Sequence, residues 1–259
     1  MKLHVLGSGS CVVDQQDRTP SGYVLEVDNL VLLVDTGTGV TRNLPELGLS
    51  VDEIDAVINT HRHPDHVSDL VPVVQDKVVR SFAQDEPAIT LYGPEGHIEY
   101  LEDRMKHEMV DLPGEIEEKF GFGFEVVEVG DRINLSDNIV MKTIEADHGP
   151  EGFTCLSLRI EGPDKTIVFT GDTDYFEELG EFAEDADLLV TDCSKPDELK
   201  VEGHMTPTES AKIARNAGVE TLLLSHLYPE TDGYDIVSKA SKTFSGKVVE
   251  AEDLMSIQV

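Results

Sequence analysis

Short runs of β-branched and other apolar residues alternate with amphipathic stretches along the whole chain. This alternation predicts an α/β fold built in layers, and residues 1–259 show no linker that would divide them into two domains. Met1–Leu6 is typical of a short buried strand. We expect further strands at Tyr23–Val27, Leu30–Val34, Ala56–Asn59, Ile89–Tyr92, Glu125–Val129, Ile139–Ile144, Cys155–Ile160, Thr166–Thr170, Leu188–Thr191 and Thr221–Ser225.

The order of these runs bears on the topology. The first four strands are expected to form two hairpin-like pairs rather than strand–helix–strand crossovers, which argues against a purely doubly wound parallel sheet. Two packed mixed sheets with helices outside fit better. Two helix starts carry a capping box, Ser50-Val51-Asp52-Glu53 and Thr206-Pro207-Thr208-Glu209, and Gly218 is a plausible stop for the second helix.

Two glycine-containing segments are interpreted as connections. Gly7-Ser8-Gly9-Ser10 follows the first strand but lacks both the third glycine of a dinucleotide motif and the Gly-Lys-Ser/Thr of a nucleotide loop. We therefore interpret it as a tight turn. Phe120–Phe124 is expected to be a flexible loop that leads into the strand at Glu125–Val129.

The chain is strongly acidic, with 20 Lys+Arg against 52 Asp+Glu and a formal net charge of −32. Such a charge repels nucleic acid and anionic lipid at ordinary salt. Two interpretations stay open: a solvated surface adapted to a salty cytoplasm, or a charge that repels or selects particular ligands. Three widely spaced cysteines without a CxxC pair argue against a disulfide framework, and no apolar run approaches the roughly 20 residues that span a bilayer. We therefore expect a cytoplasmic protein without a membrane partner.

Three of the nine histidines fall within Thr60–His66, in the pattern H-x-H-x-D-H. The segment directly follows a predicted buried strand, so a rigid scaffold holds its side chains. His61 and His63, two residues apart on an extended turn, can close on one ion, while Asp65 and His66 are placed for a second. Imidazole and carboxylate donors without thiolate suit Zn²⁺, with Mn²⁺ or Fe²⁺ as alternatives.

Three further polar residues, His148, Asp172 and His226, each follow a predicted strand. A lone histidine is more often a packed or surface residue than a ligand, but the shared position at strand ends favours ligation here. Histidines without such a context are interpreted as structural or surface residues: His4, His97 and His107.

Taken together, these residues resemble the metallo-β-lactamase superfamily, and the spacing of the later motifs is similar to that of its ribonuclease Z branch. The resemblance covers nearly the whole chain and includes Leu6–Ser10, Ser21–Tyr23 and Val34–Gly37. It implies a four-layer αββα sandwich of two mixed sheets with helices outside. It also implies one metal at His61, His63 and His148, a second at Asp65, His66 and His226, and Asp172 as a bridge between them.

His63 bears on the type of reaction. Oxygen-reducing diiron members of the superfamily usually carry glutamate at this position, so the resemblance implies hydrolysis rather than redox chemistry. Two ions roughly 3.5–4 Å apart would lower the pKa of a shared water, and we expect attack by a metal-bridging hydroxide. In the resembling enzymes the aspartate at Asp65 also orients or deprotonates this water, which makes Asp65 the general-base candidate.

His204 helps to choose among hydrolases. It directly precedes the capped helix at Thr206, and helix N-termini favour anions. Gly203-His204-Met205-Thr206 resembles the His-Ser-Thr or His-Met-Thr element of the ribonuclease Z branch, whose histidine binds the scissile phosphate or protonates the leaving oxygen. The alternative is a histidine that orders the loop against Thr206.

The resemblance has a limit. Long ribonuclease Z enzymes carry a basic arm between the lone-histidine ligand and the Gly-Asp-Thr motif. Only residues 149–171 lie between His148 and Asp172, and predicted strands take up most of them. The missing arm and the excess of acid both make long structured RNA a less favoured substrate.

The leading hypothesis is therefore a dinuclear phosphodiesterase for small or nucleotide-like substrates. The alternatives are a carboxylic ester, thioester or lactone hydrolase on the same metals, transfer-RNA 3′ processing despite the missing arm, and a non-catalytic metal-binding module. Related enzymes are often dimers, so a homodimer is an option. Residues 72–128, which lie between the first cluster and His148, are expected to supply much of the substrate wall.

Overall fold

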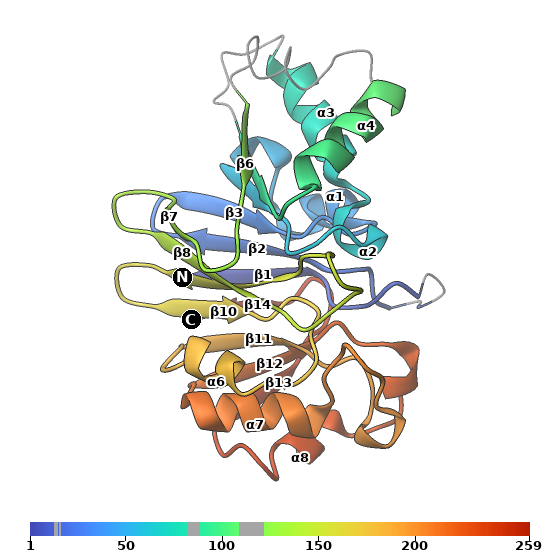
Figure 1. Cartoon of the computed structure of the whole chain (residues 1–259), viewed down its shortest axis with the longest axis vertical. Coiled ribbons are helices and arrows are strands. Elements are labelled where there is room, and N and C mark those ends of the chain that lie inside the picture. The colour runs from blue at the N-terminus through green and yellow to red at the C-terminus, as the bar shows by residue number, and fades with distance from the viewer. Residues whose placement is uncertain (13–14, 16, 82–88, 109–121) are drawn as a thin grey trace.

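Two sheets pack face to face in the middle of the molecule (Figure 1). The computed structural model describes residues 1–12, 15, 17–81, 89–108 and 122–259, and both sheets have seven strands within these residues. The first sheet contains, in spatial order, β14 (Ser256–Gln258), β1 (Lys2–Gly7), β2 (Gly22–Val27), β3 (Leu30–Val34), β4 (Ala56–Ile58), β5 (Thr90–Gly93) and β6 (Gly123–Val126). The second contains β13 (Lys247–Glu250), β12 (Thr221–Ser225), β11 (Leu188–Asp192), β10 (Thr166–Phe169), β9 (Leu156–Glu161), β8 (Val140–Glu145) and β7 (Arg132–Asn134).

Helices cover the outer sides of both sheets. Those on the side of the first sheet are α1 (Val40–Asn43), α2 (Pro64–Val67), α3 (Leu70–Ser81) and α4 (His97–Glu108), with the 3-10 turns η1 (Pro45–Leu47) and η2 (Val51–Glu53). Those on the side of the second sheet are α6 (Glu178–Phe182), α7 (Pro207–Ala217) and α8 (Ile236–Ala240), with the 3-10 turns η3 (Asp197–Leu199) and η4 (Pro229–Thr231). Figure 1 shows the resulting order of helices, sheet, sheet and helices, and the predicted αββα sandwich is confirmed.

Each sheet joins an antiparallel half to a parallel half. In the first sheet, β14, β1, β2 and β3 are antiparallel neighbours, whereas β3, β4, β5 and β6 run parallel. In the second, β7 to β10 are antiparallel and β10 to β13 parallel. The predicted pairing of the first four strands into two hairpins is therefore wrong for β3 and β4, because α1, η1 and η2 form a crossover between them. The carboxyl ends of the parallel strands meet at one edge of each sheet.

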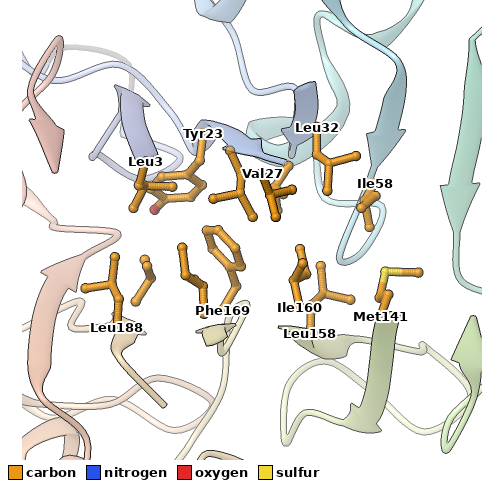
Figure 2. Packing of buried hydrophobic residues seen from close by; sticks show 14 of the residues in the cluster. Leu3, Tyr23, Val27, Leu32, Ile58, Met141, Leu158, Ile160, Phe169 and Leu188 are labelled. Atoms are coloured by element: carbon orange, nitrogen blue, oxygen red, sulfur yellow. The ribbon is translucent and has the colours of Figure 1, made fainter. Parts of the chain in front are cut away.

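The inner faces of the two sheets form the main hydrophobic core. Apolar side chains of the first sheet, such as Leu3, Tyr23 and Leu32, face Leu158 and Phe169 of the second across the interface (Figure 2). These side chains are at most 5% exposed. A further buried cluster lies between the first sheet and its helices, and another between the second sheet and its helices. Burial on both faces explains why the central strands are nearly continuous apolar runs.

Three local predictions need correction. The Ser50 capping box is present, but it opens only the 3-10 turn η2 rather than an α-helix. Gly7-Ser8-Gly9-Ser10 forms no tight turn: Gly7 ends β1, and Gly9 forms a bridge with Leu227. A Cβ at Gly7 would lie 1.8 Å from the carbonyl oxygen of Pro20, so close backbone approach requires glycine there.

The third correction concerns β6. This strand begins at Gly123, inside the segment predicted as a loop, and ends at Val126. Phe120 and Gly121 lie outside the described residues.

The connection between β9 and β10 is too short to contain the basic arm of long ribonuclease Z enzymes. Ile160 and Glu161 pair with Ile167 and Thr166 in antiparallel register, and the residues between them form a tight turn. Gly162 donates its backbone N–H to the carbonyl of Lys165 at 2.9 Å. The prediction that no arm is inserted between His148 and Asp172 is confirmed. Among the described helices, none has the length and hydrophobicity needed to cross a membrane.

Candidate metal centre

Seven side chains that the sequence singled out as metal ligands converge where the carboxyl ends of the strands meet. His61 and His63 follow β4, Asp65 and His66 lie in α2, and His148, Asp172 and His226 follow β8, β10 and β12. Their donor atoms form two groups, and Asp172 belongs to both. The two sheets contribute to each group, so the centre depends on their packing.

The first group consists of three imidazoles and one carboxylate. His61 Nε2 and His148 Nε2 lie 3.0 and 3.1 Å from His63 Nδ1. Asp172 Oδ2 lies 3.7 Å from His61 Nε2 and 3.8 Å from His148 Nε2. Ligands at 2.0–2.1 Å from a tetrahedral zinc are separated by about 3.3 Å, so the spacing in this group fits one such ion.

The second group consists of two imidazoles and two carboxylates. His66 Nε2 lies 3.3 Å from Asp172 Oδ1 and 3.8 Å from Asp65 Oδ2. His226 Nε2 lies 3.4 Å from the same two oxygens. Asp172 therefore directs Oδ2 to the first group and Oδ1 to the second, which is the arrangement of a carboxylate that bridges two ions.

One buried nitrogen supports the fit to metal independently of these distances. His66 is only 1% exposed, and its Nε2 is inaccessible to solvent and makes no hydrogen bond. A buried polar atom without a partner is costly, and a metal ion would satisfy it. The donors are imidazole and carboxylate without thiolate, a set that suits Zn²⁺.

Hydrogen bonds fix four of the imidazoles with Nε2 directed inward. His66 Nδ1–H donates to Asp35 Oδ2 at 2.7 Å, and His148 Nδ1–H donates to the carbonyl of Gly203 at 2.8 Å. His61 Nδ1 lies 3.0 Å from Thr60 Oγ1, and His226 Nδ1 lies 3.1 Å from the hydroxyl of Ser194. Such contacts set the tautomer and orientation of metal-ligating histidines.

Asp35 also supports the backbone of the first ligand segment. Its Oδ1 accepts the backbone N–H of Thr60 at 2.9 Å, directly before His61. Asp35 and His226 both adopt positive φ angles, 58° and 55°. Left-handed backbone at non-glycine residues is uncommon and concentrates at functional sites, where surrounding contacts maintain it.

Charges within the centre keep its aspartates ionised. Burial opposes the charge on Asp172, but His226 and His66 outweigh it and hold the pKa of Asp172 well below its usual range. Burial also opposes the charge on Asp65, yet its contacts with His226 and His66 lower its pKa. Both carboxylates are therefore in the form that binds cations.

His204 lies beside the second group and is held by Asp192. His204 Nδ1–H donates to Asp192 Oδ2 at 2.7 Å, and its ring stacks on His226 with centroids 5.4 Å apart. The helix start at Thr206 has the predicted capping box, which fixes the backbone just after His204. Burial disfavours the protonated imidazole, but the charge and hydrogen bond of Asp192 outweigh it and raise the pKa of His204.

Asp192, His204 and His226 form a third cluster of donor atoms, but hydrogen bonds already satisfy it. Asp192 accepts the backbone N–H groups of Thr173 and Ser194, the hydroxyl of Ser194 and the ring N–H of His204. This carboxylate therefore supports the centre through neighbouring groups and is no third metal site.

The sequence interpretation missed two of the supporting residues. It gave Asp35 no role and ended the strand before Asp192 at Thr191. Both obey the rule that pointed to the ligands: Asp35 directly follows β3, and Asp192 is the last residue of β11. A carboxylate at the end of a buried strand was the signal that could have found them.

The substrate wall expected at residues 72–128 stays a prediction. Its described parts include β5 and β6, which are strands of the first sheet, and α3 and α4, which lie on the outer side of that sheet. Residues 82–88 and 109–121 lie outside the described part of the chain.

Comparison with known proteins places these features in a family. A model of the beta-lactamase superfamily domain matches residues 31–227. The probable metallo-hydrolase YhfI of Bacillus subtilis is 30% identical over 254 residues, which cover 96% of both chains. Ribonuclease Z of Mycolicibacterium gilvum is 28% identical and covers all of this chain and 96% of its own.

Solved structures agree on the fold. The crystal structure of Bacillus subtilis YhfI aligns with a TM-score of 0.83 and 26% identity over 99% of this chain and 98% of its own. The short form of human tRNase Z aligns with a TM-score of 0.78 and 21% identity over 100% and 99%. A diphosphatase of the PhnP family aligns with a TM-score of 0.75 and 18% identity over 100% and 97%.

Proposed function

This chain belongs to the beta-lactamase superfamily, and from that membership and the geometry of its centre we propose that it is a dinuclear metal-dependent phosphodiesterase. His61, His63 and His148 would hold one ion, Asp65, His66 and His226 the other, and Asp172 both. Two divalent ions, zinc by the preference of these donors, would supply an activated water and neutralise charge on the substrate.

The contact between His204 and Asp192 is the observation that favours a phosphodiester over a carboxylic ester as the substrate. With Nδ1–H donated to Asp192, the imidazole of His204 presents Nε2 beside the centre, and Asp192 raises the pKa of His204, which favours the doubly protonated ring. A protonated Nε2 can bind a phosphate oxygen or pass its proton to a leaving alkoxide. An alkoxide is a poor leaving group unless it is protonated.

Asp65 is the candidate for the opposite proton transfer. Its side chain is 8% exposed and lies among the donor atoms of the second group. The lowered pKa of Asp65 keeps the carboxylate ionised, so that it can orient a water through Oδ while that water loses its proton. Asp65 and His204 would then act as base and acid on the same substrate.

A second candidate function is 3′ processing of transfer RNA. Relatives named ribonuclease Z cover the whole chain at 25–28% identity. Two features argue against an RNA substrate. A tight turn between β9 and β10 stands where a basic arm would be inserted, and the net charge of −32 repels an RNA backbone. We therefore rank it below a small phosphodiester.

One set of assays tests the proposal. The purified protein should contain about two metal equivalents and hydrolyse bis-p-nitrophenyl phosphate. His204→Ala should lower kcat on the order of 100-fold with unchanged metal content, as expected for loss of a group that binds a phosphate oxygen in the transition state. His107→Ala is the matched control, because His107 is exposed on α4 and should leave the rate unchanged.

Other outcomes would overturn the proposal. Activity only on carboxylic esters, thioesters or lactones would assign the centre to acyl substrates. Fewer than two metal equivalents without any hydrolysis would favour a metal-binding module. Cleavage of a precursor transfer RNA at its 3′ side, at a higher kcat/KM than that of the small esters, would favour the second candidate.

A further inference from the structure

A hollow of about 360 Å³ opens directly beside the candidate centre. His148 forms part of its lining, together with the loop from Glu145 to Phe153 and Phe176 from the segment after β10. Backbone contacts hold the two walls together: Asp174 donates its N–H to the carbonyl of Asp147 at 2.9 Å, and Asp147 donates to Thr173 Oγ1 at 3.0 Å. The hollow is therefore built from the same segments that present two of the candidate ligands.

The lining combines negative charge with aromatic surface. Glu145, Asp147 and Glu151 are exposed carboxylates, and Phe153 and Phe176 supply ring surface. Among the described residues that line the hollow, none carries a lysine or arginine side chain. This composition is the opposite of a channel that binds a polynucleotide, which needs cations along the backbone.

Arg62 is a cation close to this wall, and its guanidinium packs against a ring of the wall without lining the hollow itself. It lies over the ring of Phe153 at 5.2 Å from the centroid. It also packs against Gly96, where an added Cβ would meet Nη1 at 2.9 Å, and it does not line the hollow. Phe153 itself stacks on His63 with centroids 4.7 Å apart, so this aromatic wall is continuous with the first group of ligands.

This inference rests on the proposed function. We infer that the hollow receives one of the two alcohol substituents of the phosphodiester, the one nearer to His148, and that this substituent is uncharged or cationic. The centre attracts one phosphate, whereas the three carboxylates repel any further phosphate on the neighbouring group. The substrate class is then a small phosphodiester whose second alcohol carries no negative charge. A nucleoside or a quaternary amine fits this requirement, and an oligonucleotide does not.

Matched substrates test the inference. Thymidine 5′-(p-nitrophenyl phosphate) and its 3′-phosphorylated derivative differ by one phosphate, and p-nitrophenyl phosphorylcholine supplies a cationic substituent. The kcat/KM of the native protein should be about tenfold lower for the 3′-phosphorylated ester than for the other two, the scale expected for like charges several ångströms apart. Assays use the lowest salt at which circular dichroism shows the protein folded.

A pair of variants separates local charge from net charge. Glu145→Gln/Glu151→Gln should narrow the preference between the two thymidine esters to within about threefold. Glu184→Gln/Glu220→Gln changes the net charge equally, but these exposed residues precede β11 and β12, at the opposite ends of strands whose carboxyl ends carry Asp192 and His226. This control should keep the native preference.

Binding gives a readout that does not depend on turnover. In calorimetric titrations of the metal-loaded protein, thymidine 5′-monophosphate should bind about tenfold more tightly than thymidine 3′,5′-bisphosphate, and Glu145→Gln/Glu151→Gln should remove the difference. Hydrolysis of both thymidine esters at equal kcat/KM, or a preference unchanged in this variant, would overturn the inference while the phosphodiesterase stands. No hydrolysis of any phosphodiester would overturn the proposed function and the inference with it.

Discussion

Asp192 controls which nitrogen of His204 faces the centre. The carboxylate is fully buried at its side chain and accepts the Nδ1–H of His204, while its remaining lone pairs are taken by Ser194 and Thr173. Asp192 reaches the ligand His226 through the hydroxyl of Ser194, whereas it accepts a direct hydrogen bond from His204. We therefore expect its loss to act on the rate chiefly through His204.

Asp192→Asn should lower kcat for bis-p-nitrophenyl phosphate by about 100-fold with unchanged metal content, because His204 loses its preferred orientation and proton. A double-mutant cycle with His204→Ala checks the route. If Asp192 acts through His204, the double variant should be no slower than His204→Ala alone. Losses that multiply in the double variant would contradict this coupling.

His97 shows the cost of burying a titratable ring without a partner. It opens α4, is fully buried, and neither of its ring nitrogens makes a hydrogen bond. Burial, helped by the charge of Arg62, lowers the pKa of His97 to about 4. Because the folded pKa lies below the unfolded value of about 6.5, the unfolded chain binds more protons as the pH falls.

As the pH is lowered from 6.5, the free energy of unfolding should therefore decrease, and His97→Leu should remove part of that decrease. Between pH 7 and pH 5 the stability of the native protein relative to His97→Leu should fall by about 2 kcal/mol, from 1.5 pH units at about 1.36 kcal/mol each. Urea titrations in the presence of a metal chelator measure the free energy of unfolding of both proteins at each pH. The effect of His97→Leu on packing cancels in the comparison because it does not depend on pH. His107→Leu, at an exposed position, should track the native protein. Parallel curves for the native protein and His97→Leu would show that folding does not lower the pKa of His97.

At the scale of elements, the segment between η3 and α7 connects several parts of the centre. Lys200 Nζ donates to Asp174 at 2.5 Å, to the carbonyl of His204 at 2.7 Å and to Glu209 at 2.7 Å. Gly203 in the same segment accepts the ring N–H of His148. One loop therefore positions both the candidate acid His204 and a candidate ligand of the first group.

Lys200→Met should lower kcat about tenfold because it frees this loop, a scale typical of residues that orient reacting groups. The temperature of unfolding should fall by only a few degrees, since the lysine is partly exposed. Lys165→Met is the matched control: Lys165 pairs with Asp187 at 2.5 Å and is similarly exposed, but it lies in the turn between β9 and β10. Equal losses of kcat in both variants would show a general effect of lost lysine contacts.

The elements that could be predicted are those whose pattern is local. Central strands such as β3 and β12 are continuous apolar runs, and the helix after Thr206 carries its own start and stop signals. Edge strands β7 and β13 were missed because they are short and none of their residues is fully buried, so they show neither an apolar run nor a clear alternation. Strand direction escaped at β4, since the sequence of a strand does not state which neighbour it meets.

The candidate centre was more predictable than the sheets around it. Ligating side chains must follow rigid strands, so His148, Asp172 and His226 could be found from their positions alone. What hid Asp192 was a boundary placed one residue early, and what hid the supporting role of Gly203 was that a carbonyl has no sequence signature. The hollow beside His148 was also hidden, because its walls meet only through contacts between loops.

At the scale of the whole molecule, the charge of −32 acts on stability as well as on ligands. Several lysines and arginines already pair with carboxylates, among them Arg18 with Glu250 and Lys142 with Glu161. With 52 acidic residues against 20 basic ones, most carboxylates still face like charge. Self-repulsion of this kind destabilises a compact state, and mobile ions screen it.

The temperature of unfolding of the metal-loaded protein should therefore rise by more than about 5 °C between 0.1 and 2 M KCl, as the Debye length falls from about 10 Å to less than 3 Å. Most of the gain should come below 1 M, where screening changes fastest. Tetramethylammonium chloride at equal ionic strength separates screening from site binding, because this large cation screens equally but cannot enter a small carboxylate site. A rise with KCl alone would assign the effect to bound potassium, and no rise with either salt would show that the folded surface spaces its carboxylates widely enough to tolerate their repulsion.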